Sequence, residues 1–343
     1  MLNNLQLIVP CHLFGRWLPV VVSLFVLLSC DESRQAVDEV ALIPVSVAAM
    51  PHSFTGYSLF LAHEKGFLRD EGLDVTIQNF SSGRQTLNAL ADRRSDFAVS
   101  SETPFIHAVL AGQDLVALAT TIHARRHLAV VARSDSGVAS VSDLVGKRLG
   151  VTMGSNGEYF LDVMLARNRL SADDIELVHT APGAMLEGLQ SGTLDAVATW
   201  NPQMTKARQQ FADNAQAFGL DDLYAPYFML LSRRDYVEEN PEAVIRVLRA
   251  LLRASRFIQE HPAQASSIVA KNLKADVETL AQLSAFYEFR LSLHQALLTM
   301  LEHQAEWIIR KNPQHTALSV NFLERIHSEP LRRIAPHNVS LIK

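Results

Sequence analysis

The sequence predicts an α/β fold built from two successive units of alternating helices and strands. A pattern that occurs twice supports this: residues 87–90 precede 96–101, and residues 186–189 precede 195–200. In each copy an amphipathic helix leads into a short apolar strand that ends in hydroxyl or aromatic residues. The length of 343 residues is that of two domains or one large one. Because helix-then-strand units recur in any α/β protein, the repeat alone leaves open whether both copies face one ligand.

The first unit is expected to begin with a strand and to alternate from there. Pro44 stands at the start of the first strand, where a missing backbone donor is tolerated. Pro104 stands in the first turn of a helix, where the N–H would be unpaired in any case. Apolar and polar residues alternate as in a half-buried strand over 74–80. The expected strands are 43–49, 74–80, 96–101 and 115–120, and the first helix is 56–65.

The second unit continues the alternation and is followed by a helical region. Its expected strands are 128–132, 148–151, 176–178 and 195–200, with helices at 158–168 and 202–212 and a strand at 228–231 that returns the chain to the first unit. From 240 to 334 the pattern is mostly helical, with Pro241 at the first helical position. Strands that alternate with helices predict mainly parallel sheets with helices on both faces.

The first 30 residues predict an export signal. Arg16 precedes an apolar run, 17–28, that is too short to span a bilayer comfortably and is typical of a signal-peptide core. The run leads into Leu-Leu-Ser before Cys30, and charged residues follow at once. This order resembles a bacterial lipobox, in which Cys30 would be lipidated. A signal anchor, or a cleaved signal with an incidental cysteine, is the alternative, and residues 31–42 are expected to form a tether.

The composition excludes several classes of function. The net charge is −5, and the densest basic stretch, 125–127, is too short for a nucleic-acid interface. Both cysteines, Cys11 and Cys30, lie in the signal region, which excludes thiol catalysis and cysteine zinc sites from the folded part. His123 and His127 are four residues apart, a spacing that would place both on one face of a helix and allow them to bind a metal together. Here a loop that runs into a strand is expected instead, so the pair does not predict a metal site. No catalytic residue, metal or cofactor is therefore expected.

Candidate ligand contacts gather where strands end, since α/β sheets bind ligands at the carboxyl ends of their strands. Ser155 and Asn156 begin a helix after a strand, and the free N–H groups there accept an anionic or polar group. Glu158 has capping-box spacing to Ser155 and is interpreted as a cap. Glu102 either binds a cationic group or caps the helix of Pro104. His52 and Tyr57 follow the first strand, and Trp200 and Asn201 follow the second repeat; each of these is either a ligand contact or a packing residue.

Three stretches, 62–75, 146–161 and 194–202, make the chain resemble the periplasmic substrate-binding proteins of ABC importers. The resemblance is to their nitrate, sulfonate and taurine group, which shares its fold with binders of thiamine-pyrimidine precursors. It implies a two-lobed type II fold with a helical C-terminal region, in which 43–122 and 228–343 form lobe 1 and 123–227 form lobe 2. It also implies that the lobes close on a ligand as a hinge. Carried over by position, the cleft would be lined by His52, Tyr57, Ser101, Glu102, Thr103, Ser155, Asn156, Gly157, Trp200 and Asn201.

The resemblance implies the solute-binding component of an ABC importer. Such a protein is a monomer that captures a small polar solute, sulfonate-like or nitrate-like, and delivers it to a permease of the inner membrane. A lipid on Cys30 would anchor it to a bacterial membrane in the periplasm, and it would bind no nucleic acid. The ligand stays open: the helix start at Ser155 favours an anion, whereas Glu102 and Glu158 favour an aminopyrimidine or another heterocycle. A pyrimidine-synthase-like enzyme would need a cysteine-rich motif that this chain lacks, and a sensory lipoprotein would need an attached module.

Overall fold

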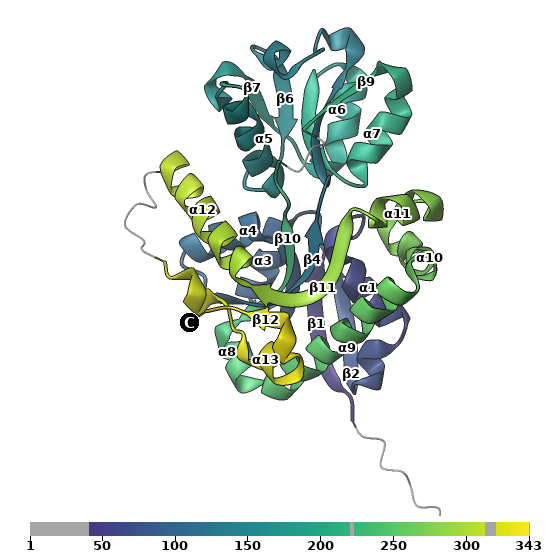
Figure 1. Cartoon of the computed structure of the whole chain (residues 1–343), viewed down its shortest axis with the longest axis vertical. Helices are drawn as coiled ribbons and strands as arrows, with labels where there is room; N and C mark the ends of the chain where they lie inside the picture. The colour runs from purple at the N-terminus through teal and green to yellow at the C-terminus, as the bar shows by residue number, and fades with distance from the viewer. Residues whose placement is uncertain (1–40, 220–222, 313–319, 343) are drawn as a thin grey trace, which may run out of the picture. The chain divides into compact units, whose positions relative to one another are not determined.

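The computed structural model describes residues 41–219, 223–312 and 320–342. In this part of the chain the strands form two sheets, which can be traced in Figure 1. The predicted signal segment, Cys30 and most of the predicted tether lie outside the described residues. Among the residues that are described, no helix has the length and apolar character needed to cross a membrane.

The first sheet has seven strands and carries both ends of the described chain. Its order is β12-β11-β4-β10-β3-β1-β2. Strand β1 pairs in parallel with β2 and β3, whereas β10 lies antiparallel between β3 and β4, and β11 lies antiparallel to β4. The strands are β1 (Ile43–Ala49), β2 (Leu73–Asn79), β3 (Phe97–Ser101), β4 (Leu115–Ala124), β10 (Tyr227–Arg233), β11 (Tyr287–His294) and β12 (Val339–Ser340).

The second sheet has five strands in the order β7-β6-β8-β5-β9. Its middle is buried on both faces: Leu128 and Val130 of β5 contact one apolar cluster, and Ala129 and Val131 contact another. This is the pattern of a sheet covered by helices on both sides. The strands are β5 (Leu128–Arg133), β6 (Arg148–Val151), β7 (Glu176–His179), β8 (Ala196–Trp200) and β9 (Ala215–Phe218). The chain passes between the two sheets after β4 and again before β10.

The helices follow the strands in both regions, as the sequence predicts. The long helix α9 is buried along one face through Val244, Val247, Leu248 and Leu251, and it starts with Pro241. It packs against α1 and β11. The helices are α1 (Tyr57–Glu64), α2 (Phe67–Asp70), α3 (Gly83–Ala91), α4 (Glu102–Leu110), α5 (Asn156–Arg167), α6 (Met185–Ser191), α7 (Gln203–Phe211), α8 (Arg234–Glu239), α9 (Pro241–Glu260), α10 (Pro262–Leu273), α11 (Val277–Ser284), α12 (Gln295–Lys311) and α13 (Glu329–Ile334).

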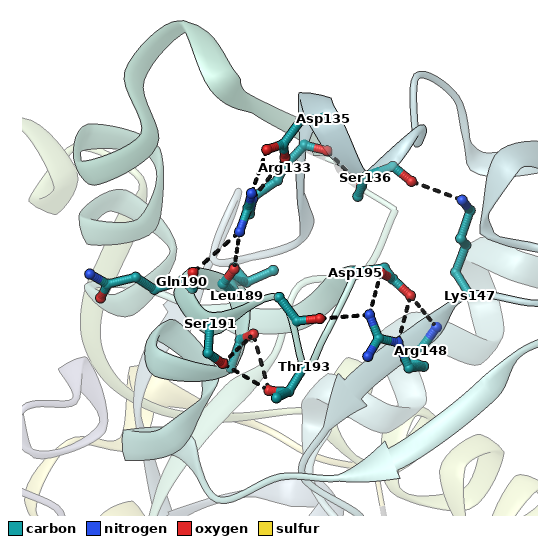
Figure 2. A network of polar contacts seen from close by, with 12 residues as sticks. Arg133, Asp135, Ser136, Lys147, Arg148, Leu189, Gln190, Ser191, Thr193 and Asp195 are labelled. Atoms are coloured by element: carbon teal, nitrogen blue, oxygen red, sulfur yellow. Dashed lines mark hydrogen bonds and ion pairs between the residues drawn. The ribbon is translucent and has the colours of Figure 1, made fainter.

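The doubled sequence pattern has the same structure in both sheets. Asp96 precedes β3, and its carboxylate accepts from the backbone N–H of Ser46 in β1 at 2.7 Å. Asp195 precedes β8, and its carboxylate accepts from the backbone N–H of Arg148 in β6 at 2.9 Å. Figure 2 shows the second copy, in which the Arg148 guanidinium also reaches Asp195 and the carbonyl oxygen of Gly192. Each repeat therefore places an Asp where it joins the entry of its strand to the neighbouring parallel strand.

Two features differ from the sequence expectation. The sheets are mixed rather than mainly parallel, because β10 and β11 return through the seven-stranded sheet and β5 runs against β8. The region after 240 is mostly helical, as expected, but it also contains β11, a strand that the sequence pattern does not predict and that pairs with β4. Apolar spacing decides whether a segment is a strand, but it carries no information about the direction in which that strand pairs.

Candidate functional site

A cavity of about 250 Å³ lies at the carboxyl ends of strands from both sheets. Segments that follow β1, β2 and β3 line it from the seven-stranded sheet, and segments that follow β6, β7 and β8 line it from the five-stranded sheet. This is the edge at which α/β sheets bind ligands. The lining residues are Met50, Ser53, Thr55, Ser81, Ser82, Gly83, Arg84, Gln85, Ser101, Pro104, His127, Thr152, Met153, Gly154, Ser155, Asn156, His179, Ala181, Pro182 and Trp200.

Three helices begin at this cavity. Ser82, Ser101 and Ser155 are the N-cap residues of α3, α4 and α5, and all three line it. The Ser82 hydroxyl accepts from the Gln85 N–H at 3.3 Å, and the Ser155 hydroxyl accepts from the Gly157 N–H at 3.1 Å. The start of a helix carries partial positive charge and unpaired N–H groups, which favour an anion. Three such starts around one cavity make its electrostatic potential positive.

Arg84 adds a full positive charge to this wall. Its guanidinium donates to the carbonyl oxygen of Met153 at 3.4 Å, so it reaches from α3 to the loop before α5. A side chain on Gly154 would place its Cβ 2.2 Å from the guanidinium, so only glycine allows this approach. Within the described ranges no carboxylate pairs with Arg84, and no Asp or Glu lines the cavity. The charged lining is therefore cationic.

Glu158 stands beside the cavity, but its negative charge is compensated. One carboxylate oxygen accepts from the Gly154 N–H at 2.6 Å, and the other accepts from the Lys311 ammonium at 3.0 Å. Glu158 thus caps the start of α5, as the sequence predicts, although the bond reaches Gly154 rather than the N-cap Ser155. Lys311 belongs to α12, and this ion pair joins α12 to α5.

Two histidines line the cavity. His179 accepts from the Met153 N–H through its Nδ1 atom at 3.2 Å. His127 is buried, and burial lowers the pKa of its imidazole to about 3 because the charged ring would lose its hydration. The Nδ1 atom of His127 lies 2.7 Å from the phenol oxygen of Tyr287.

Four of the predicted site residues line this cavity: Ser101, Ser155, Asn156 and Trp200. Trp200 ends β8, and its side chain is 7% exposed. Gly157 lies directly behind it, since a Cβ on that residue would sit 3.4 Å from the Trp200 ring. The apolar part of the lining consists of Trp200 together with Met50, Pro104, Met153, Ala181 and Pro182.

Glu102 and Thr103, both expected to line the cleft, do not line this cavity. The Glu102 carboxylate is fully buried and accepts from the Tyr224 hydroxyl, from the Gln304 amide at 3.1 Å and from the Tyr227 N–H at 3.2 Å. Burial raises the pKa of Glu102 to about 7, against the lowering effect of these hydrogen bonds. Thr103 donates to Gln304 at 2.6 Å. This buried network ties the start of α4 to α12 and to the segment before β10.

His52, Tyr57 and Asn201 also lie outside the lining. Tyr57 is fully buried, with its hydroxyl 3.2 Å from that of Ser266. His52 has a positive φ of 67°, and its carbonyl oxygen accepts from the Gln203 amide at 3.3 Å. Asn201 is fully buried behind Trp200, and its amide oxygen accepts from the Thr205 hydroxyl at 2.8 Å.

The sequence reasoning omitted several lining residues that carry chemistry, above all Arg84, His127 and His179. Residues 81–84 follow a predicted strand, so the same rule of strand ends that selected Ser155 would have selected them. His179 likewise ends β7. His127 precedes its strand instead, and no local pattern distinguishes it from a loop histidine.

A larger open groove of about 1020 Å³ lies elsewhere, between α9, α11 and β11. None of the sequence-predicted residues lines it, and it does not lie at the carboxyl ends of the parallel strands. The smaller cavity is therefore the candidate functional site.

Comparison with known proteins identifies the family. The family model NMT1/THI5 like matches residues 53–265. The chain belongs to the NMT1/THI5 like family. This member is 27% identical over 254 residues to a Bacillus subtilis protein with the provisional name aliphatic sulfonates-binding protein, over 73% of this chain and 75% of that protein.

Solved structures confirm the fold predicted for this NMT1/THI5 like protein. The periplasmic aliphatic sulphonate binding protein SsuA of Escherichia coli matches with a TM-score of 0.70 and 21% identity, over 83% of this chain and 97% of that one. A Candida albicans gene product that exhibits the generic periplasmic binding protein fold matches with a TM-score of 0.65 and 16% identity, over 88% and 98%. At these identities the likeness establishes the fold alone.

Proposed function

We propose that this chain is the solute-binding component of an ABC importer and that it captures a small anion with an organic part, such as an alkanesulfonate. The observation that carries the proposal is the charge of the cavity. Arg84 and three helix starts face it, whereas its described lining contains no carboxylate. The hydroxyls of Ser53 and Thr55 hydrogen-bond each other at 2.7 Å, which leaves the O–H of one of them to donate to a ligand. The names of the sulfonate-binding relatives support the same class of ligand.

The alternative ligand, an aminopyrimidine, is not favoured by the position of the two acidic groups. Glu102 is buried in its own hydrogen-bond network, and Glu158 is paired with Lys311. Neither carboxylate is free to bind the cationic edge of a heterocycle. The role proposed here is binding without catalysis, and within the described residues the cavity offers no cysteine nucleophile.

The proposed mechanism is closure of two lobes on the ligand. Lobe 1 comprises 43–122 and 228–343, and lobe 2 comprises 123–227, so the chain crosses between them twice. A ligand that contacts the ends of β1 to β3 and of β6 to β8 at once favours the closed arrangement. The Lys311–Glu158 ion pair and the Gln203–His52 hydrogen bond join the proposed lobes beside the cavity. The closed form would dock on the permease as a monomer.

A thermal-shift screen tests the proposed function. Purified protein is melted with ethanesulfonate, taurine, nitrate, aminopyrimidines and amino acids, each over a concentration series. A ligand of the native state raises the melting temperature as RT ln(1 + [L]/Kd). We expect sulfonates to give the largest shifts. A shift with aminopyrimidines alone would replace the ligand class, and the absence of any shift would overturn the binding role.

We also propose a periplasmic location with a lipid anchor at Cys30. The order of apolar run, small residue, cysteine and charged residues supports it. In a bacterial host the wild-type chain is expected in the membrane fraction, and Cys30→Ser is expected in the soluble periplasmic fraction. Cys11→Ser is the matched control and should not change the distribution. Membrane association of Cys30→Ser would contradict the anchor.

A further inference from the structure

His127 occupies a position in the cavity wall that the proposed function does not yet explain. Its side chain is 2% exposed and lies next to the start of β5. Its ring packs edge-on against Phe228, with centroids 5.1 Å apart. Its backbone carbonyl oxygen accepts from the Asn201 N–H at 3.0 Å. Backbone and ring are therefore both held in place, which is a requirement for a group that orients a ligand.

The two ring nitrogens of His127 have different surroundings. Nδ1 lies 2.7 Å from the Tyr287 hydroxyl oxygen. Nε2 has no hydrogen-bond partner among the described residues. Nε2 is not one of the buried side-chain atoms that lack a partner, so it is open to the cavity that His127 lines. A ligand in the cavity can therefore hydrogen-bond Nε2 directly, in place of water.

A hydrogen-bond chain behind the cavity determines which nitrogen carries the proton. The amide oxygen of Asn201 accepts from the Thr205 hydroxyl at 2.8 Å, and its amide nitrogen donates one N–H to the carbonyl oxygen of Arg126 at 3.4 Å, which leaves its second N–H as a donor. The Asn201 side chain also hydrogen-bonds Tyr287 and opposes the rise that burial causes in the pKa of that phenol. An amide N–H that donates to the phenol oxygen leaves the phenol O–H to donate to Nδ1 of His127. Nδ1 is then unprotonated, and the ring proton resides on Nε2.

We infer that His127 is a neutral donor whose Nε2–H binds an acceptor atom of the anionic ligand, and that Asn201 and Tyr287 are positioning residues that fix this tautomer. The inference rests on the proposed function and deepens it, since it defines the recognised group as one that only accepts hydrogen bonds. Sulfonate oxygens meet this requirement without a proton of their own. An ammonium or amino group placed at this position would offer no acceptor to Nε2–H and would lie near the Arg84 charge, so binding in that orientation is disfavoured.

The tautomer is tested directly by NMR. The protein is labelled with ¹⁵N-histidine, and long-range ¹H–¹⁵N spectra are recorded without ligand and with ethanesulfonate, the His127 signals being assigned from their loss in His127→Gln. We expect a neutral ring with its proton on Nε2, and a change in the Nε2 shift when ethanesulfonate is added. In Tyr287→Phe the two tautomers should mix. A proton on Nδ1 in the wild type, or an Nε2 shift that ethanesulfonate does not change, would overturn the inference.

Affinity measurements distinguish a hydrogen bond donated by His127 Nε2 from a role of His127 in packing alone. The amide nitrogen of Gln reaches about as far as Nε2 of His, whereas the amide nitrogen of Asn reaches only as far as Nδ1. We expect His127→Gln to bind ethanesulfonate within about threefold of the wild type and His127→Asn to bind about 10- to 100-fold more weakly, as for loss of a hydrogen bond to a charged group. His63→Asn, on the exposed face of α1, is the control and should bind as the wild type does.

The possible failures can be told apart. If the wild type binds ethanesulfonate and the Gln and Asn variants of His127 have equal dissociation constants, the inference is overturned and the proposed function stands. If the wild type binds none of the screened anions, the proposed function fails and the inference fails with it. Melting curves of each variant confirm that it is folded before its affinity is compared.

Discussion

Replacing Arg84 by Gln removes the guanidinium from the cavity wall and keeps a side chain of similar length. At about 4 Å, two opposite charges attract by about 1 kcal/mol in water and by about 4 kcal/mol at an effective dielectric constant of 20. Arg84 is exposed, and its described hydrogen bond goes to the neutral carbonyl oxygen of Met153. Its attraction for a bound anion therefore belongs near the lower limit, about 1–2 kcal/mol. The dissociation constant of Arg84→Gln for ethanesulfonate should therefore be about 5- to 30-fold larger than that of the wild type.

Isothermal titration calorimetry of the wild type, Arg84→Gln and Arg84→Lys measures this difference. Arg84→Lys keeps the charge but loses the planar fork, so its affinity should fall between the other two. The wild-type dissociation constant should rise more steeply with salt than that of Arg84→Gln, since salt screens the exposed charge. Arg94→Gln is the control, because Arg94 is exposed, pairs with Asp92 and does not line the cavity. Equal affinities of Arg84→Gln and the wild type would refute the role given to Arg84.

Three further changes test other parts of the structure. Trp200→Ala removes an apolar wall and should weaken ethanesulfonate binding about tenfold while unfolding stays cooperative; unchanged affinity in calorimetry would remove Trp200 from the site. Glu102 has a pKa of about 7 in the folded state against 4.5 in a model compound, so the folded state binds more protons between these values and stability is lost as the pH rises through 7. Urea unfolding of the wild type should therefore lose about 3 kcal/mol between pH 4.5 and pH 8 relative to Glu102→Gln, and parallel pH profiles would contradict this. Lys311→Met removes the ion pairs of Lys311 with Glu158 and Asp162 and should speed ligand dissociation two- to fivefold in stopped-flow experiments. An unchanged dissociation rate would show that these ion pairs do not stabilise the ligand-bound state.

Periodicity predicts most elements of this fold because burial imposes it. The strands from β1 to β8 and the amphipathic face of α9 follow apolar spacing, and the structure confirms them. Strand β11 also alternates, with Tyr287, Phe289 and Leu291 buried between more exposed residues, but helices surround it in the sequence. Its pairing partner, β4, lies far away along the chain. A strand embedded in a helical region is recognised from its tertiary partner more readily than from its neighbours.

The candidate site, like the fold, could be predicted from the sequence only in part. The rule of strand ends leads to the edge of both sheets at which the candidate cavity lies, and Ser101, Ser155 and Trp200 line that cavity. The rule does not decide which of two adjacent residues faces inward. Glu102 follows Ser101 directly, yet its carboxylate is buried against Tyr224. That orientation depends on partners far along the chain, which spacing in the sequence does not reveal.

Every described residue of the cavity wall lies between Met50 and Trp200, in short segments at the ends of strands. The elements after β10 contribute support from behind, through Tyr287 and Gln304, without joining the wall. The wall is thus contributed by short segments between the strands, while residues after β10 hold some of these segments from behind. Exchange of a wall segment between homologues should therefore transfer ligand preference only if its support, such as Tyr287 behind His127, is exchanged with it.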